Sequence, residues 1–204
     1  MADSPDTRPS LLVRIRDASD KQAWKQFVEL YGPLVYRFGR KRGLQDADAA
    51  DLTQTVLHAI SGAIGGFDYD PARGAFRGWL LGVVRNQLGK MHRREQHAPR
   101  GTGDTAAQVR LHEQPAPDDD EELWDREYKR QRFRWAAERV RGEFEPKSWD
   151  AFWMTAVDGK AAAEVAGRLK LSIGAVYTAH SRILSRIRRE IESLNDEGLG
   201  GEPC

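Results

Sequence analysis

Residues 159–190, GKAAAEVAGRLKLSIGAVYTAHSRILSRIRRE, are predicted to form two helices joined by the short turn Lys170-Leu171-Ser172. The Ser172 hydroxyl is placed to cap the second helix, since serine is a preferred residue at that position. Small alanines in the first helix allow the two helices to approach closely. We expect the helices to pack through six apolar residues, which are Val165, Ala166, Leu169, Ile173, Val176 and Ile183.

This spacing is typical of the helix-turn-helix motif, whose second helix enters the major groove of DNA. The polar face of that helix supplies the candidate DNA contacts, which are Ser172, Ala175, Tyr177, Thr178, Ser181, Arg182 and Arg186. Among them, Arg182 could pair with guanine and Arg186 could meet a phosphate. The alternative is an ordinary helical hairpin with a solvated basic face.

The rest of the chain is also predicted to be helical. From Asp20 to Gly43 an apolar stripe recurs every three or four residues, with an interruption or kink at Gly32-Pro33. Further helices are expected over residues 46–64, 76–95, 123–142, 147–157, 161–169 and 173–194. Because no stretch alternates with the period of two that marks a strand, we predict an all-α fold.

Charge divides the 204 residues into blocks, although the net charge is only +1. Residues 21–97 carry 12 basic and 7 acidic side chains, residues 98–127 carry 3 and 9, and residues 128–192 carry 14 and 8. Two basic blocks separated by an acidic one suggest two modules that meet a polyanion. We therefore predict two small helical domains joined by a flexible acidic linker, with these boundaries: tail 1–19, domain 20–96, linker 97–122, domain 123–194 and tail 195–204.

Aromatic residues precede basic ones in the second half of the first domain. Rings that stack on bases, followed by cations that hold phosphates, suit a site for single-stranded DNA. The candidate residues are Phe67, Tyr69, Phe76, Trp79, Asn86, Lys90, Arg93 and Arg94. In the alternative interpretation the aromatic residues are core and the cations are a solvated helix end.

Composition narrows the possible function classes. The single cysteine, Cys204, cannot form an internal disulfide, and the five histidines lack the paired spacing of a metal site. No glycine-rich phosphate loop or nucleophile motif is present, so we predict neither an enzyme nor a cofactor. No apolar run approaches the ~20 residues of a membrane span, and we expect a cytoplasmic protein without membrane insertion.

Three segments in order resemble a bacterial RNA polymerase sigma factor of the sigma-70 superfamily, of the minimal two-domain, extracytoplasmic-function type. Residues 48–60 (DAADLTQTVLHAI) resemble its polymerase-binding helix, residues 76–87 (FRGWLLGVVRNQ) its promoter-melting helix, and residues 161–188 its terminal helix-turn-helix. The resemblance implies that residues 20–96 are sigma domain two, which melts and reads the −10 promoter element. It implies that residues 123–194 are sigma domain four, which reads the −35 element.

The resemblance also implies partners, namely core RNA polymerase, promoter DNA and an inhibitor, which is either an anti-sigma factor or another inhibitory molecule. The implied core-polymerase contacts are Asp48, Asp51, Gln54, Thr55 and His58, where threonine at 55 replaces the glutamate usual in the family. The acidic run 118–122 resembles linkers that pass through the RNA channel of the polymerase, or else it only adds solubility. The main rival function is a stand-alone helix-turn-helix regulator that binds an operator.

Overall fold

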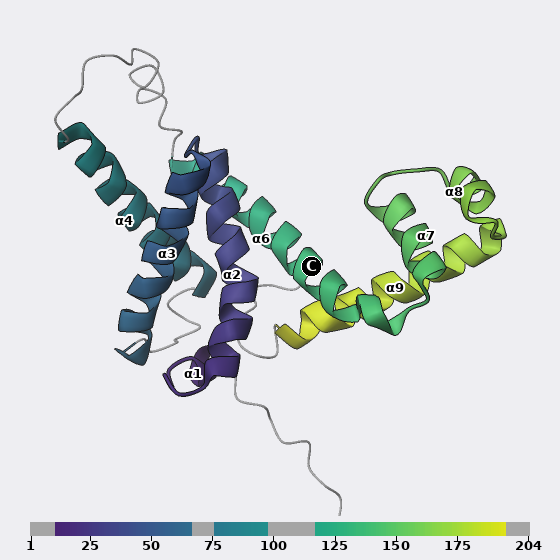
Figure 1. Ribbon diagram of the computed structural model, residues 1–204, viewed down its shortest axis with the longest axis horizontal. Coiled ribbons are helices and arrows are strands. Elements are labelled where there is room, and N and C mark those ends of the chain that lie inside the picture. Colours follow the sequence, from purple (N-terminus) through teal and green to yellow (C-terminus); the bar gives the residue numbers. More distant parts are fainter. Residues whose placement is uncertain (1–10, 67–75, 98–116, 195–204) are drawn as a thin grey trace, which may run out of the picture. The chain divides into compact units, whose positions relative to one another are not determined.

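The computed structural model describes residues 11–66, 76–97 and 117–194, and every regular element in these ranges is helical (Figure 1). The all-α prediction is therefore confirmed. The chain divides into two compact units, which we call unit 1 (residues up to Gln131) and unit 2 (Arg132–Asn195). Within the described ranges, no helix combines the length and the apolar character that a membrane crossing requires.

Unit 1 is built on helices that pack through the predicted apolar stripes. Its elements are α1 (Leu11–Arg14), α2 (Lys21–Lys41), α3 (Asp46–Ala63), the 3-10 turn η1 (Ile64–Gly66), α4 (Phe76–His97) and the first half of α6 (Pro117–Val140). The stripe of α2 is fully buried at Ala23, Phe27, Leu30, Leu34 and Phe38, and that of α3 at Leu52, Val56 and Ile60. The periodicity thus identified the core faces of both helices correctly.

Unit 1 begins earlier than predicted. Leu11, Leu12 and Ile15 lie in the predicted tail but are buried. The Asp20 carboxylate accepts a hydrogen bond from the Ala23 backbone N–H (2.9 Å) and pairs with Arg14 Nε (2.9 Å). The hydrogen bond from Arg14 lowers the pKa of Asp20. These contacts cap α2 and fasten the preceding segment to it, because a carboxylate satisfies the free N–H groups at a helix start.

Of the expected interruption or kink at Gly32-Pro33, the interruption is wrong, since α2 runs without a break from Lys21 to Lys41. The kink stays a prediction. A proline inside a helix has no N–H for the carbonyl four residues earlier, which here is Glu29. The side chain of Gln131 in α6 supplies the missing donor, with its Nε2 3.2 Å from the Glu29 carbonyl oxygen. A hydrogen bond from a distant helix thus satisfies the carbonyl that proline leaves free.

Helix α6 starts at Pro117, inside the predicted linker, and its first half completes the core of unit 1 beside α2 (Figure 1). Trp124 is 1% exposed and packs edge-on against Phe38, with 5.2 Å between ring centroids. Tyr128 is also buried and stacks on Tyr31 at 6.4 Å. The boundary between the units therefore falls after Gln131, where the prediction placed it at 122/123.

The acidic start of α6 is also part of unit 1. The buried carboxylate of Asp120 pairs with Arg42 and with Arg85, whose Nε lies 3.2 Å from Oδ2. Further along, the buried Glu127 lies 3.4 Å from Arg37 Nε. An acidic side chain is rarely buried unless it is paired. Asp120 is therefore part of the core of unit 1, and it is neither a residue of an extended linker in the RNA channel nor a solubilising surface residue.

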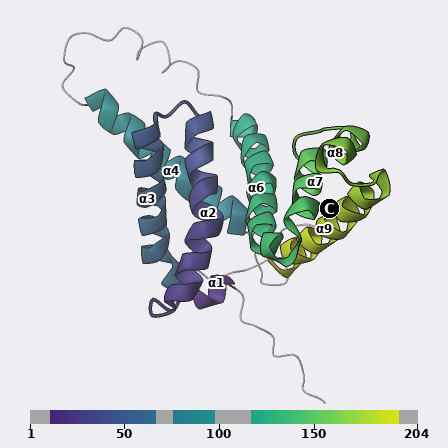
Figure 2. The same ribbon diagram turned by 45° about the vertical axis from the view of Figure 1, so that its right-hand side comes forward.

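Unit 2 contains the second half of α6, followed by η3 (Arg141–Glu143), α7 (Pro146–Ala156), α8 (Ala162–Leu169) and α9 (Ile173–Leu194). Helices α7 and α8 both pack on α9 (Figure 2). The packing residues between them are Ala151, Val165, Ala166, Val176 and Ala179. Arg132 Nη2 donates to the Ile191 carbonyl (3.0 Å), which joins α6 to the end of α9.

Candidate nucleic-acid and protein interfaces

The turn between α8 and α9 has the geometry of a tight helix-turn-helix connection. Lys170 ends α8 in the left-handed conformation (φ 54°, ψ 49°), and the Leu171 N–H donates to the Ala166 carbonyl at 2.9 Å. The Ser172 hydroxyl accepts from the Ala175 N–H at 3.1 Å, so the predicted cap is confirmed. The left-handed residue reverses the chain and the serine starts α9 immediately afterwards.

The outer face of α9 is exposed as the sequence predicts. Val176, Ile183 and Ile187 are buried on the inner face. The exposed candidates are Ser172, Ala175, Tyr177, Thr178, Ser181 and Arg182. In the part of the chain that the structure describes, Arg182 has no ion-pair partner, so its guanidinium is available to a ligand. Contact of this face with DNA stays a prediction.

Ile173 differs from the prediction, which placed it in the packing between the two helices. Its side chain is 48% exposed. Leu169 and Leu171 pack against the hairpin core instead, and Leu171 comes from the turn itself. The prediction failed because it did not foresee that a turn residue would fill the space between the helices.

The guanidinium of Arg186, the predicted phosphate contact, is already paired with carboxylates of unit 2. Its Nε and Nη2 donate to both carboxylate oxygens of Glu143 (2.8 and 2.7 Å), and its Nη1 donates to Glu190 (2.9 Å). The hydrogen bonds to Glu143 and then Glu190 raise the pKa of Arg186. Arg186 therefore holds η3 against α9, and its contact with a phosphate stays a prediction.

This assignment predicts that Arg186→Ala lowers the stability of unit 2 by up to about 1 kcal/mol, the upper end of the usual range for an ion pair at a surface. Chemical denaturation of the full chain measures the change. The control is Arg182→Ala, which removes an unpaired cation of the same helix and should leave stability unchanged. If Arg186→Ala instead leaves stability unchanged and weakens the salt dependence of DNA binding, Arg186 contacts a phosphate as first predicted.

Helix α3 carries the predicted polymerase contacts on one face. Asp51, Gln54, Thr55 and His58 are exposed, while Asp48 is half-buried. Asp51 lies three and four residues before Gln54 and Thr55, and His58 lies four and three residues after them. Such spacing places side chains side by side on a helix surface. The opposite face is the buried stripe of α3. The structure therefore brings all five predicted residues onto one helix with a polar, carboxylate-bearing surface.

Helix α4 separates the predicted promoter-melting residues into two groups. Asn86, Lys90, Arg93 and Arg94 are exposed. Phe76 is instead 1% exposed, with its ring 5.4 Å from that of Tyr31 and 5.9 Å from that of Phe27. This corrects its assignment as a stacking residue, because a ring enclosed by aromatic neighbours has no face left for a base.

The remaining aromatic candidates are distributed differently. Trp79 is half-buried and packs against Phe76 at 5.3 Å. Phe67 and Tyr69 lie outside the residues that the structure describes. Among the described residues, the α4 candidates for base and phosphate contact are thus the polar side chains on the second half of the helix.

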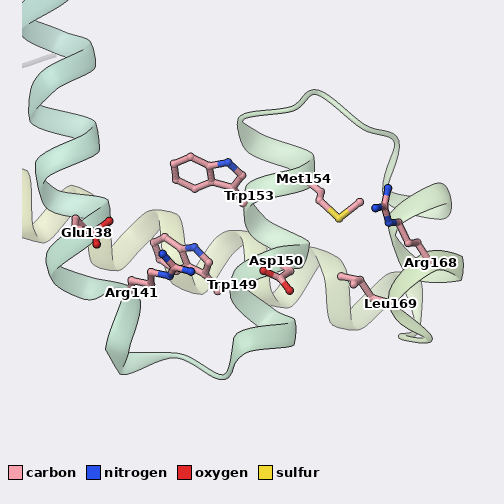
Figure 3. A pocket seen from close by; sticks show the side chains of 8 residues that line it. All are labelled: Glu138, Arg141, Trp149, Asp150, Trp153, Met154, Arg168 and Leu169. Atoms are coloured by element: carbon pink, nitrogen blue, oxygen red, sulfur yellow. The ribbon is translucent and has the colours of Figure 1, made fainter.

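A pocket of about 480 Å³ lies on unit 2 (Figure 3). Two indoles form one wall, Trp149 and Trp153, with ring centroids 6.0 Å apart. The other lining residues are Glu138, Arg141, Asp150, Met154, Arg168 and Leu169, so the lining includes no serine, cysteine or histidine. In the described part of the chain, no group of three or more His, Cys, Asp or Glu residues is placed to hold a metal ion.

Comparison with known proteins finds a family match within the first unit. Residues 27–98 match the family model of Sigma-70 region 2, a range that includes α3 and α4. No curated protein matches the chain. Among solved structures, the chain is similar to CnrH in complex with the cytosolic domain of CnrY, with 21% sequence identity, a TM-score of 0.35, and coverage of 90% of this chain and 96% of that chain. On the match of residues 27–98, this part of the chain is similar to a sigma-70 region 2 domain.

Proposed function

We propose that this protein is a sigma factor of the extracytoplasmic-function type, which binds core RNA polymerase and directs it to specific promoters from the cytoplasm. Unit 1 binds the polymerase through the exposed face of α3 and holds the melted downstream promoter element through α4. Unit 2 reads the upstream element through α9. The observation that carries the proposal is the combination, in one chain, of a match to sigma-70 region 2 with a helix-turn-helix whose second helix is exposed.

The division of labour follows from the chemistry of the two exposed surfaces. The face of α3 offers a carboxylate, an amide and a hydroxyl to a basic protein surface. The second half of α4 offers three cations and the Asn86 amide, which suit phosphates and a base edge respectively. A protein that needs both surfaces works at the place where polymerase and DNA meet.

A stand-alone operator-binding regulator is the alternative, and it requires no polymerase contact. The region 2 match favours the sigma factor, because the match contains the exposed α3 face that such a regulator does not need. The decisive experiment adds the purified full-length protein to core polymerase and measures initiation on a promoter library. We expect promoter-dependent transcripts only when both are present. Tight binding to one DNA site by the free protein, without any transcript, would favour the regulator.

The cations of α4 give a separate prediction. Replacing Lys90, Arg93 and Arg94 together by glutamine should weaken formation of the open complex and flatten its salt dependence. Each cation that neutralises a single-stranded phosphate contributes about 0.7 to the slope of log K against log salt. Removing all three cations should therefore reduce the magnitude of that slope by about 2. Permanganate footprinting over a salt series measures both effects.

The matched control neutralises the exposed Lys21, Lys25 and Lys41 of α2, which changes the net charge by the same amount on another helix. We expect this variant to open promoters with the salt dependence of the unaltered protein. Equal effects of the two triple variants would show that overall charge, and not the α4 surface, controls melting.

A further inference from the structure

Two large apolar side chains are exposed at the beginning of α9. Ile173 is 48% exposed and Tyr177 is 64% exposed. They are four residues apart, so they lie next to each other on the helix surface. Single exposed apolar residues are ordinary on a protein surface. Two adjacent ones, on a surface expected to bind a ligand, indicate that the ligand has an apolar group at that place.

The packing of unit 2 does not require these two side chains. Leu169 and Leu171 already pack against the core between α8 and α9. Apart from its chain neighbours and the helix backbone, a Cβ built on Gly174 would meet only the Ser172 hydroxyl oxygen, 3.9 Å away, so the helix surface beside Ile173 is open at Gly174. The two residues therefore remain available to a partner.

The polar groups near these side chains are already bonded within α9. The Ser172 hydroxyl accepts from the Ala175 N–H, and the Thr178 hydroxyl donates to the Gly174 carbonyl at 2.9 Å. Residues 172–181 contain no acidic or basic side chain except His180, which faces Thr155 and Phe152 of α7, and Arg182 is the first arginine or lysine of the helix. The first two turns of α9 thus present a neutral, largely apolar surface.

In the major groove, the C5-methyl group of thymine is the apolar feature of a base edge. Resting on the proposed function, in which α9 enters that groove, we propose that Ile173 and Tyr177 recognise thymine methyl groups. The upstream element then contains A·T pairs at the two positions opposite these side chains. The guanine contact of Arg182 lies at a separate position, because Arg182 follows more than a turn later along the helix.

The first test selects promoter DNA with the holoenzyme formed from the full-length chain and core polymerase. The probe is a duplex library randomised over the upstream element with a constant downstream element. We expect enrichment of A·T pairs at two positions, and each of Ile173→Ala and Tyr177→Ala should abolish the enrichment at one of them. Tyr177→Phe should keep it, because the ring and not the hydroxyl makes the contact. Val157→Ala, at another exposed apolar residue of unit 2, is the control and should select the same sequences as the unaltered protein.

The second test removes only the methyl groups. Deoxyuridine replaces thymidine at the two enriched positions of the selected duplex, and we expect about fourfold weaker binding for each methyl, the typical effect of burying one such group. Ile173→Ala should be insensitive to the replacement at its own position. Selection of G·C pairs at these positions overturns the thymine contact, and so does binding by the unaltered protein that is unaffected by deoxyuridine. In either case, recognition of the DNA by α9 still stands if Arg182→Ala weakens binding. No enrichment anywhere in the randomised region would overturn recognition by α9 as well.

Discussion

Replacing Trp124 by alanine is expected to lower the free energy of unfolding of unit 1 by about 3–5 kcal/mol, the usual range for a large buried aromatic residue. Its indole is enclosed by the first half of α6 and by α2, where it meets Phe38 edge-on. Alanine cannot fill that volume, and the helices close such a cavity only in part. Since whole domains are stable by about 5–15 kcal/mol, the variant should leave unit 1 close to unfolding.

Hydrogen exchange of the full chain, read by peptide, locates the effect. Amides of α2 and α4 should become less protected in Trp124→Ala, while those of α8 and α9 stay protected. The matched control is Trp149→Ala, a buried tryptophan of unit 2, which should show the reverse pattern. If Trp124→Ala leaves the protection of α2 and α4 intact, the first half of α6 does not belong to the core of unit 1, and the boundary moves back toward residue 122.

The sequence predicted those parts of the fold that depend on local periodicity. The stripe of α2, from Ala23 to Phe38, is buried as expected because a helix with one apolar face has one stable way to bury it. The turn before α9 was also predictable, because the Ser172 cap is a contact between residues three positions apart. Both features involve residues a few positions apart.

The features that were not predictable depend on contacts between distant residues. Asp120 belongs to a run of acidic residues that in isolation favours a solvated linker, and only its pairing with Arg42 and Arg85 makes its burial favourable. The continuity of α2 through Pro33 likewise depends on Gln131, a residue 102 positions from the carbonyl that it satisfies. No window of sequence contains both partners of such a contact.

The candidate site was predicted only in part, because the surroundings of several of its residues also depend on contacts with other elements. Phe76 stands among apolar residues on several sides of α4, and periodicity alone does not decide which of them face the core. Arg186 has the spacing of a DNA contact, but Glu143, on a different element, neutralises it. Ile173 was missed as an exposed residue, although its position four residues before Tyr177 was a signal that the two share a surface.

Polymerase binding is expected to depend strongly on the exposed face of α3. In a variant with Asp51→Arg and Gln54→Ala, a cation replaces a carboxylate that faces a basic partner surface, and a hydrogen-bonding amide is removed. Residues at the centre of an interface typically contribute about 2 kcal/mol or more, so we expect at least about 30-fold weaker assembly with core polymerase. Competition between labelled and unlabelled protein for core polymerase measures the change.

The fold should tolerate both substitutions, because Asp51 and Gln54 are exposed while Leu52 and Val56 of the same helix hold the core. Unchanged thermal denaturation verifies this. The matched control is Asp158→Arg, which makes the same change of charge at an exposed residue of unit 2 and should leave assembly unaffected. If the α3 variant is folded and competes as well as the unaltered protein, the α3 face is not the polymerase contact. Equally weak assembly of the Asp158→Arg variant would instead indicate attraction by overall charge, because only a local contact distinguishes these two exposed carboxylates.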